Sequence, residues 1–267
     1  MKERLVISVS GKGGVGKTTA SGLLSRIIAE QTQRSLLLVD ADPVMNLPRA
    51  LGVDVPASVG EIATQMRKKI DDGTLPASAA KQDILEGEIF EALIEGDRFD
   101  FLAMGRTEGE GCYCYVNRIL TQILDTLTMN YEITLLDMTA GLEHFSRRTD
   151  RNVDVLIIVI DSSRAAFEAA LRIRDLAKEV HIDFKKLVVI GNRIPANLVD
   201  AVSQGLEENG LYLAGMIPND DEVAKLNYMG KPVFDLPHDS PAFQAVEEIA
   251  EKLGLLSEVT LLKLLGQ

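Results

Sequence analysis

The chain has no tryptophan, few aromatic residues and only two cysteines among its 267 residues. The shortage of aromatic side chains predicts a core built mainly from aliphatic residues. Long hydrophobic runs are also missing, since no stretch reaches the roughly 18 uninterrupted apolar residues of a membrane-spanning helix. Residues Met1 to Arg4 lead directly into an apolar segment, without the hydrophobic stretch and cleavage site of a secretion signal. We therefore expect a cytoplasmic protein with no membrane partner.

Basic residues are scarce relative to acidic ones: 28 Lys and Arg stand against 40 Asp and Glu, which gives a net charge of −12. Nonspecific affinity for nucleic acid comes mainly from Lys and Arg that displace counterions, so this charge argues against a nucleic-acid partner. Hydrophobic residues make up 46% of the chain and charged residues 25%, an ordinary balance for a globular protein. We expect one α/β domain over residues 1–267.

The stretch GKGGVGKTT, residues 11–19, follows an apolar run and precedes a helical pattern. A glycine-rich turn between a strand and a helix lets successive backbone N–H groups face a polyphosphate, so the stretch predicts a P-loop rather than an ordinary glycine turn. In that motif Lys17 reaches the β- and γ-phosphates, and Thr18 places its hydroxyl on Mg²⁺. The predicted nucleotide contacts in this loop are Gly13, Gly14, Val15, Gly16, Lys17, Thr18 and Thr19.

A second lysine, Lys12, lies inside this loop. The form KGGVGKTT resembles the deviant P-loop of the SIMIBI class of dimeric ATPases, which includes MinD and ParA. In that class the extra lysine crosses the dimer interface to the phosphates bound by the partner. The resemblance implies that Lys12 and Lys17 are catalytic, that MgATP and ADP are the nucleotides, and that the active unit is a homodimer.

Two further apolar runs, residues 36–39 and 133–136, end in acidic residues. Parallel α/β sheets bind ligands at the carboxyl ends of their strands, so both runs predict buried strands that bring carboxylates to the nucleotide. By resemblance, Asp42 is the switch I residue that orients or activates water near Mg²⁺, with Asp40 behind it. Asp137 resembles the Walker B aspartate that holds Mg²⁺ through water. For Asp40 and Asp42 the alternative is a helix cap or an Asp turn.

The two cysteines, Cys112 and Cys114, lie one residue apart in a segment rich in glycine and glutamate. In an extended segment both thiols face the same side, yet two thiolates leave a tetrahedral metal ion short of two ligands. A second copy of the chain across a two-fold axis would complete a Cys₄ site for Zn²⁺, Ni²⁺ or Cu⁺. The alternative is that both cysteines are small residues of the core.

The segment MGRTEGEGCYCYVN, residues 104–117, resembles the motif of CooC-type ATPases, the nickel-insertion accessory proteins of carbon monoxide dehydrogenase and acetyl-CoA synthase. This resemblance implies nickel or zinc at the dimer interface and one of those enzymes as the client. The chain departs from the family at Thr139, where glutamate is typical, and at Val44, where asparagine usually follows Asp-Pro. His144 is a further candidate metal ligand, but a lone histidine is more often structural.

Two later strand ends are candidates for contacts with the nucleotide base. Asn192 and Arg193 follow the apolar run at residues 187–190, and an amide there can both donate to and accept from a base edge. Pro218 and Asp220, which follow the next α/β repeat, resemble the second base contact of the family. For Asn192 the alternative is a turn asparagine.

Strand and helix patterns alternate along the whole chain, which predicts a doubly wound, mainly parallel sheet with helices on both faces. The predicted strands cover residues 5–9, 36–39, 99–104, 133–136, 153–160 and 187–190. The predicted helices cover residues 18–33, 59–69, 84–94, 115–127, 164–180 and 241–253. The leading interpretation is an ATP-hydrolysing metallochaperone. The alternatives are a MinD- or ParA-like positioning ATPase without a metal role, and a nucleotide-dependent reductase with an Fe–S cluster at the dimer seam.

Overall fold

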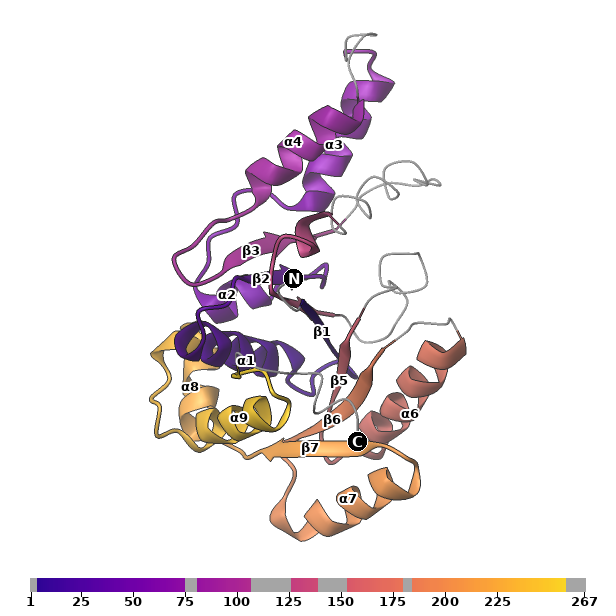
Figure 1. The fold of residues 1–267 in the computed structure, drawn as a ribbon, viewed down its shortest axis with the longest axis vertical. Coiled ribbons are helices and arrows are strands. Elements are labelled where there is room, and N and C mark those ends of the chain that lie inside the picture. The colour runs from indigo at the N-terminus through magenta and orange to yellow at the C-terminus, as the bar shows by residue number, and fades with distance from the viewer. Residues whose placement is uncertain (1–3, 75–80, 107–125, 139–152, 180–183, 258–267) are drawn as a thin grey trace.

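The computed structural model describes the chain except for residues 1–3, 75–80, 107–125, 139–152, 180–183 and 258–267. The described part contains a seven-stranded sheet in the order β3-β2-β4-β1-β5-β6-β7, and every neighbouring pair of strands is parallel (Figure 1). The strands are β1 (Leu5–Ser10), β2 (Leu36–Asp40), β3 (Asp100–Ala103), β4 (Ile133–Asp137), β5 (Val155–Ile160), β6 (Lys186–Asn192) and β7 (Tyr212–Ile217). The predicted doubly wound parallel sheet is confirmed.

Helices cover both faces of this sheet, with α1, α8 and α9 on one face and α6 and α7 on the other (Figure 1). The helices are α1 (Lys17–Gln31), α2 (Leu47–Leu51), α3 (Val59–Asp71), α4 (Lys81–Ala92), α6 (Arg164–Glu179), α7 (Val199–Glu208), α8 (Asp221–Met229) and α9 (Pro241–Lys252), with 3-10 turns η2 (Ala196–Leu198) and η3 (Val233–Asp235). Every predicted helix overlaps one of these except that at residues 115–127, most of which lies outside the described residues. Helices α2 and α8 were not predicted. The five residues of α2 are too few to show a period.

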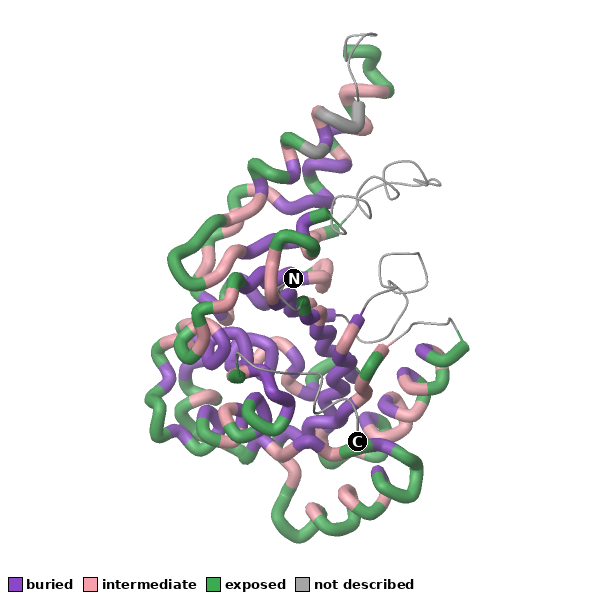
Figure 2. Tube along the Cα trace, in the orientation of Figure 1, coloured by how far each residue is buried: buried purple, intermediate pink, exposed green. Residues whose placement is uncertain are grey.

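The core is aliphatic, as the composition predicts. Phe101 and Phe243 are the aromatic side chains among the buried hydrophobic residues of the described ranges. Figure 2 shows the buried positions concentrated in the strands and in α1. All six residues of β5 are buried, because helices cover both of its faces. A continuously apolar strand of this kind is what the run at residues 153–160 predicts.

Strand β2 contributes to two separate hydrophobic clusters, because successive side chains of a strand point to opposite faces. Leu36 and Leu38 belong to the large cluster that includes α1. Leu37 and Val39 belong to a smaller cluster formed with α3 and α4. These two helices form a hairpin that projects beyond the edge strand β3 (Figure 1).

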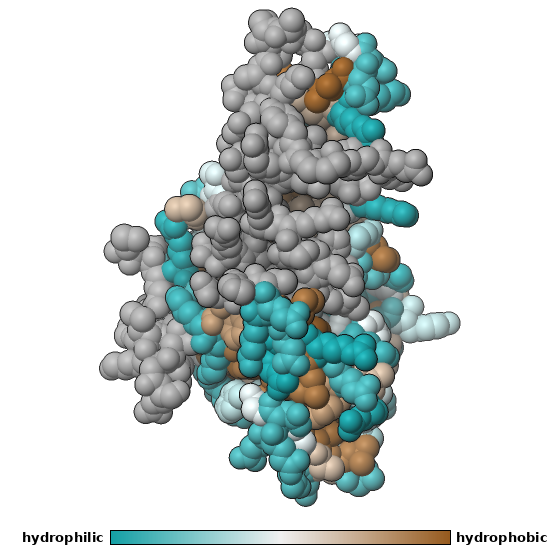
Figure 3. Space-filling view, turned by 90° about the vertical axis from the view of Figure 1, so that its right-hand side faces the viewer, coloured by the Kyte–Doolittle hydropathy of each residue, from teal (hydrophilic) through white to brown (hydrophobic). Residues whose placement is uncertain are grey.

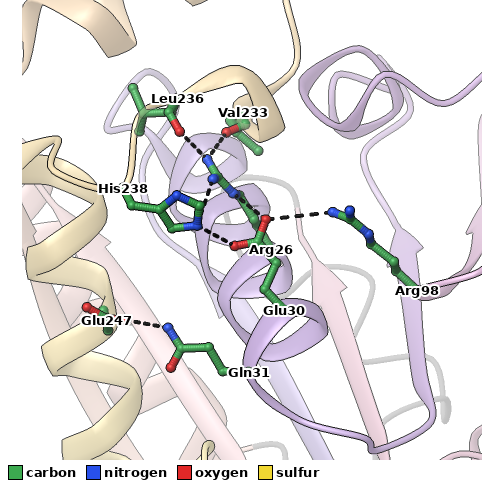
Figure 4. A network of polar contacts seen from close by, with 8 residues as sticks. All are labelled: Arg26, Glu30, Gln31, Arg98, Val233, Leu236, His238 and Glu247. Carbon is green, nitrogen blue, oxygen red and sulfur yellow. Dashed lines mark hydrogen bonds and ion pairs between the residues drawn. The ribbon is translucent and has the colours of Figure 1, made fainter.

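Helix α1 is tied to the C-terminal part of the chain through the buried guanidinium of Arg26 (Figure 4). Its Nη1 donates to the carbonyl oxygens of Val233 at 2.8 Å and Leu236 at 2.6 Å. Its Nε donates to the Glu30 carboxylate at 2.9 Å. The guanidinium carbon also lies 4.7 Å from the ring centre of Phe243 in α9. The helix that follows the glycine-rich loop is therefore fixed to η3 and α9.

Hydrophobic and hydrophilic side chains are interspersed over the lower part of the face shown in Figure 3. A pocket of about 240 Å³ between α6 and α7 is lined by apolar residues that include Phe167 and Val202 and by polar residues that include Asp161 and Arg164. In the described ranges, no helix combines the length and the hydrophobicity that crossing a bilayer requires.

Candidate functional site

The glycine-rich loop at residues 11–16 connects β1 to α1 at the carboxyl edge of the sheet. Gly11 has φ +143° and Gly16 has φ +96°. A Cβ atom on Gly11 would overlap the carbonyl oxygen of Val159 in β5, and one on Gly16 would overlap the side-chain nitrogen of Asn192. Only glycine therefore fits at both positions of this sharp turn. The loop leads into the N-terminus of α1, where backbone N–H groups favour an anion.

Asp137, the last residue of β4, lies directly under this loop. Its carboxylate accepts hydrogen bonds from the Thr18 hydroxyl at 2.8 Å and the Ser21 hydroxyl at 3.0 Å. Burial raises the pKa of Asp137 to about 6, although the hydroxyl donors and the Lys17 ammonium favour the ionised form. Mg²⁺ prefers hard oxygen ligands, and the Thr18 hydroxyl beside a buried carboxylate supplies that chemistry. Thr18 and Asp137, two of the residues predicted to hold Mg²⁺, are therefore in direct contact.

The Lys17 side chain is largely buried at the start of α1, with its Nζ 3.3 Å from the Lys12 carbonyl oxygen. Burial lowers the pKa of Lys17, and the Asp137 and Asp42 carboxylates oppose this effect. Its ammonium group is thus poorly hydrated and feels the charge of two nearby acids, a setting in which an anionic phosphate would be a favourable additional partner. The Lys12 side chain, in contrast, is exposed.

Asp40 shapes the loop that carries Asp42. The fully buried Asp40 carboxylate accepts from the backbone N–H groups of Asp42 at 2.9 Å and Leu47 at 3.0 Å. Burial raises the pKa of Asp40 to about 7 despite these two donors. Asp42 in turn accepts from the Val44 N–H at 2.9 Å, which is the geometry of an Asp turn. The turn leaves Asp42 at the wall of the pocket described below.

The end of β6 holds the glycine-rich loop in place. The Asn192 side-chain nitrogen donates to the Val15 carbonyl oxygen at 2.7 Å, and Arg193 Nη2 donates to the Gly14 carbonyl oxygen at 2.8 Å. Arg193 also adopts φ +55°, an unusual conformation for a residue other than glycine. Asn192 and Arg193, two of the four predicted base contacts, therefore lie against the loop and bind its carbonyl groups.

The Asp220 carboxylate is engaged in the fold. Its Oδ1 accepts from the Glu222 N–H at 2.9 Å at the start of α8. Its Oδ2 accepts from the Ser240 hydroxyl at 2.6 Å and the Ala242 N–H at 3.1 Å at the start of α9. Asp220 thus caps α8 and joins it to α9.

A pocket of about 490 Å³ opens over the loop. Its lining includes the predicted residues Gly13, Gly14, Gly16, Lys17, Thr18, Thr19, Asp42 and Arg193. The remaining lining residues, which the sequence did not indicate, are Asn46, Arg49, Ala50, Asn227, Gly230 and Lys231. The predicted residues Lys12, Val15, Asp137, Asn192, Pro218 and Asp220 are not in the lining. Ser21 was also missed, although its position three residues after Thr18 places both on one helix face.

The predicted metal site falls on segments outside the described part of the chain. Cys112, Cys114, Thr139 and His144 lie outside the described residues. Among the residues that are described, no group of three or more His, Cys, Asp or Glu side chains is arranged to hold a metal ion.

Comparison with known proteins places these features in a family. Residues 6–233 match the model of the CobQ/CobB/MinD/ParA nucleotide binding domain. An uncharacterized ATP-binding protein of Methanocaldococcus jannaschii is 43% identical, and the match covers 93% of this chain and 98% of that protein. The carbon monoxide dehydrogenase accessory protein CooC of Rhodospirillum rubrum is 32% identical over 88% of this chain and 90% of that protein.

The solved structure of the septum site-determining protein MinD of Pyrococcus horikoshii, complexed with Mg-ADP, has the same fold. It matches with a TM-score of 0.66 at 22% identity and covers 96% of this chain and 100% of that chain. The parallel sheet, the glycine-rich loop and the family match agree with one another. The chain therefore belongs to the CobQ/CobB/MinD/ParA nucleotide-binding domain family of P-loop ATPases.

Proposed function

We propose that this ATPase is a maturation factor that uses MgATP-driven dimerisation to handle a metal ion for carbon monoxide dehydrogenase. The observation that carries the proposal is the Thr18–Asp137 pair, 2.8 Å apart beneath a P-loop, in a chain that also contains a Cys-x-Cys motif. The relative CooC, named as an accessory protein of carbon monoxide dehydrogenase, supports the choice of client. Acetyl-CoA synthase is the other client that the motif suggests.

The described residues suit ATP hydrolysis. Bound Mg²⁺ would neutralise charge on the β- and γ-phosphates, and Thr18 and Asp137 are the residues that would hold it. Lys17 binds the phosphates, and Asp42 positions a water molecule for attack on the γ-phosphorus. The bond from that phosphorus to the bridging oxygen breaks, so phosphate and ADP are the products.

Lys12 supplies the link between two copies of the chain. Its exposed side chain does not line the pocket of its own chain, which agrees with a role at the phosphates of a partner. A lysine that reaches across the dimer would add positive charge where the transition state accumulates negative charge. Hydrolysis would then require the dimer.

Cys112 and Cys114 bind the metal ion that the dimer carries. Two thiolates from each chain across a two-fold axis form a tetrahedral Cys₄ site, and thiolates bind nickel, zinc and copper ions well. In this proposal the metal is the ion delivered to the client enzyme. ATP hydrolysis separates the chains and so changes the number of ligands from four to two.

Metal analysis of the purified dimer tests whether Cys112 and Cys114 bind a metal ion. Wild type and a Cys112→Ser/Cys114→Ser variant are loaded with Ni²⁺ or Zn²⁺, and bound metal is measured by mass spectrometry on size-separated fractions. We expect about one ion per wild-type dimer and none in the variant. Equal metal content in the two proteins would contradict a cysteine site. An absorption spectrum of anaerobically purified protein separates these ions from an Fe–S cluster.

Hydrolysis by a Lys12→Ala variant tests the dimeric mechanism. We expect turnover to fall to background while nucleotide still binds to the monomer, because Lys12 acts on the partner's phosphates. The matched control is Lys225→Ala, which removes an exposed lysine of α8 that does not line the pocket. Normal turnover by Lys12→Ala would exclude the role of this lysine across the interface.

The second candidate is a positioning ATPase, which the fold shared with MinD favours. In that case ATP would control binding to a surface, and the cysteines would have no metal role. Sedimentation with lipid vesicles or DNA in the presence of ATP distinguishes the two. ATP-dependent sedimentation by a protein that binds no metal would favour the positioning function.

A further inference from the structure

Met45 has a strained backbone at the end of the turn that carries Asp42. Its φ is +52°, and in the described part of the chain Arg193 is the other non-glycine residue with a positive φ. A residue of this size rarely adopts that conformation, which persists only where surrounding contacts hold it. The Met45 N–H donates to the Asp42 carbonyl oxygen at 2.9 Å and so closes the turn. The contacts that hold Met45 therefore also hold Asp42.

The Met45 side chain lies beside the start of the segment that follows β3. It is half-buried and packs against the large hydrophobic cluster. A Cβ atom on Gly105 would lie 3.4 Å from Met45 Sδ and would overlap the side chain of Ser58, the N-cap residue of α3. Gly105 also has φ +61°. Only glycine fits here, and its small size lets α3 and Met45 approach the same short segment closely.

Backbone hydrogen bonds join the same three parts of the chain. The Met104 N–H donates to the Asp40 carbonyl oxygen at 2.8 Å, and the Met104 carbonyl oxygen accepts from the Gly60 N–H of α3 at 2.8 Å. The Asp40 carboxylate in turn accepts from the N–H groups of Asp42 and Leu47. These bonds fix Met104 to α3 on one side and to the loop that carries Asp42 on the other.

We propose that Met45 is a positioning residue for ATP hydrolysis, and that its contact beside Gly105 fixes Asp42. Gly105 begins the segment that contains Cys112 and Cys114, so a movement of the backbone at Gly105 would reach Asp42 and change the rate of hydrolysis. Neither Met45 nor Gly105 lines the nucleotide pocket, so both act indirectly. This assignment rests on the proposed function, because it takes Asp42 to position the attacking water.

The test separates the rate of hydrolysis from the binding of ATP. Phosphate release is measured for wild type, Met45→Ala and Met45→Leu, at protein concentrations where the rate per chain is constant. We expect Met45→Ala to lower kcat about 10- to 100-fold, because a shift of about 1 Å in a reacting group has an effect of this size. The KM for ATP should stay within about twofold, since Lys17 and Thr18 still bind the phosphates. Met45→Leu keeps an apolar side chain beside Gly105 and should retain most of the rate.

Met129→Ala is the matched control, because it removes a methionine side chain that is 57% exposed. Its kcat should equal that of wild type. A Met45→Ala variant with a raised KM and a normal kcat would show an effect on binding and would overturn the positioning role.

A pair of glycine variants tests the same contact from the other side. Gly105→Ala places a methyl group against Ser58 and Met45. Gly210→Ala has a similar backbone strain, with φ +67°, but its methyl group meets no atom within 4 Å. We expect Gly105→Ala alone to lower kcat without changing KM, in protein that circular dichroism shows to be folded. Equal kcat values for the two variants would contradict the coupling.

An Asp42→Asn variant distinguishes a failure of this inference from a failure of the proposed function. Slow hydrolysis by Asp42→Asn together with a wild-type kcat for Met45→Ala would overturn the positioning role alone. Normal hydrolysis by Asp42→Asn would overturn the role of Asp42 in the proposed function, and this inference with it.

Discussion

Replacement of Arg26 by alanine tests whether the nucleotide helix depends on the C-terminal segment. The Arg26 side chain is 3% exposed and donates to the Glu30 carboxylate. It also donates to the carbonyl oxygens of Val233 and Leu236. Arg26→Ala removes a buried donor from all three acceptors, although the Val233 carbonyl oxygen also accepts from the Leu236 N–H and Glu30 also lies 3.0 Å from His238 Nε2. An unsatisfied buried group costs about 1–3 kcal/mol, and a broken buried charge pair about 3–5 kcal/mol.

We therefore expect Arg26→Ala to lower the free energy of unfolding by about 3–5 kcal/mol, a large part of the ~5–15 kcal/mol that stabilises a typical domain. The measurement is equilibrium unfolding in urea, followed by circular dichroism. Arg26→Lys should lose less stability, because one ammonium group can still donate to some of the same acceptors.

Arg98→Ala is the matched control for this experiment. Arg98 approaches the same Glu30 carboxylate at 3.6 Å, but its side chain is 57% exposed. An exposed ion pair contributes about 0–1 kcal/mol, so this variant should unfold almost like wild type. If Arg26→Ala lost no more stability than Arg98→Ala, the buried network would not fasten α1 to η3.

Three further predictions concern Glu30, the capping box of α3 and the Asp137 carboxylate. Burial would raise the pKa of Glu30, but bonds from Arg26 and His238 outweigh it and hold this pKa below 4.5. Glu30 thus stabilises the fold above that pH, so wild type should lose urea stability on acidification more steeply than Glu30→Gln. Ser58→Ala, which removes the capping box of α3, should cost about 1 kcal/mol by urea unfolding without changing the KM for ATP. Asp137→Asn should slow ATP hydrolysis at least about 100-fold, whereas Ser21→Ala, which removes one bond to the same carboxylate, should slow it less than about tenfold in a phosphate-release assay.

The sequence predicts the sheet and the phosphate loop because both depend on local signals. Fully apolar runs such as β5 indicate strands covered on both faces, and the spacing of glycine, lysine and threonine specifies the loop. The carboxylates at the ends of β2 and β4 follow from the rule that ligands bind at the carboxyl edge of a parallel sheet. Asp40 and Asp137 are indeed neighbours across these two strands.

The features that the sequence did not predict depend on contacts between segments that lie far apart in the chain. Arg26 bonds to carbonyl groups 207 and 210 residues away, and nothing in the local pattern of α1 indicates this. Arg49 and Lys231, far apart in the sequence, line the same pocket because α2 packs near η3. An aspartate that caps a helix and one that binds a ligand look alike in sequence, so the capping bonds of Asp220 became visible only in the structure.

Because the two faces of β2 support separate hydrophobic clusters, the parts of the molecule packed on them differ in how readily they unfold locally. Leu37 and Val39 support α3 and α4, whereas Leu36 and Leu38 support α1 and the phosphate loop. The α3–α4 hairpin can therefore separate from the sheet without breaking the contacts on the other side of the strand. Amide protons in this hairpin should exchange with solvent ahead of those in α1, so one end of the molecule can fluctuate while the nucleotide end stays closed.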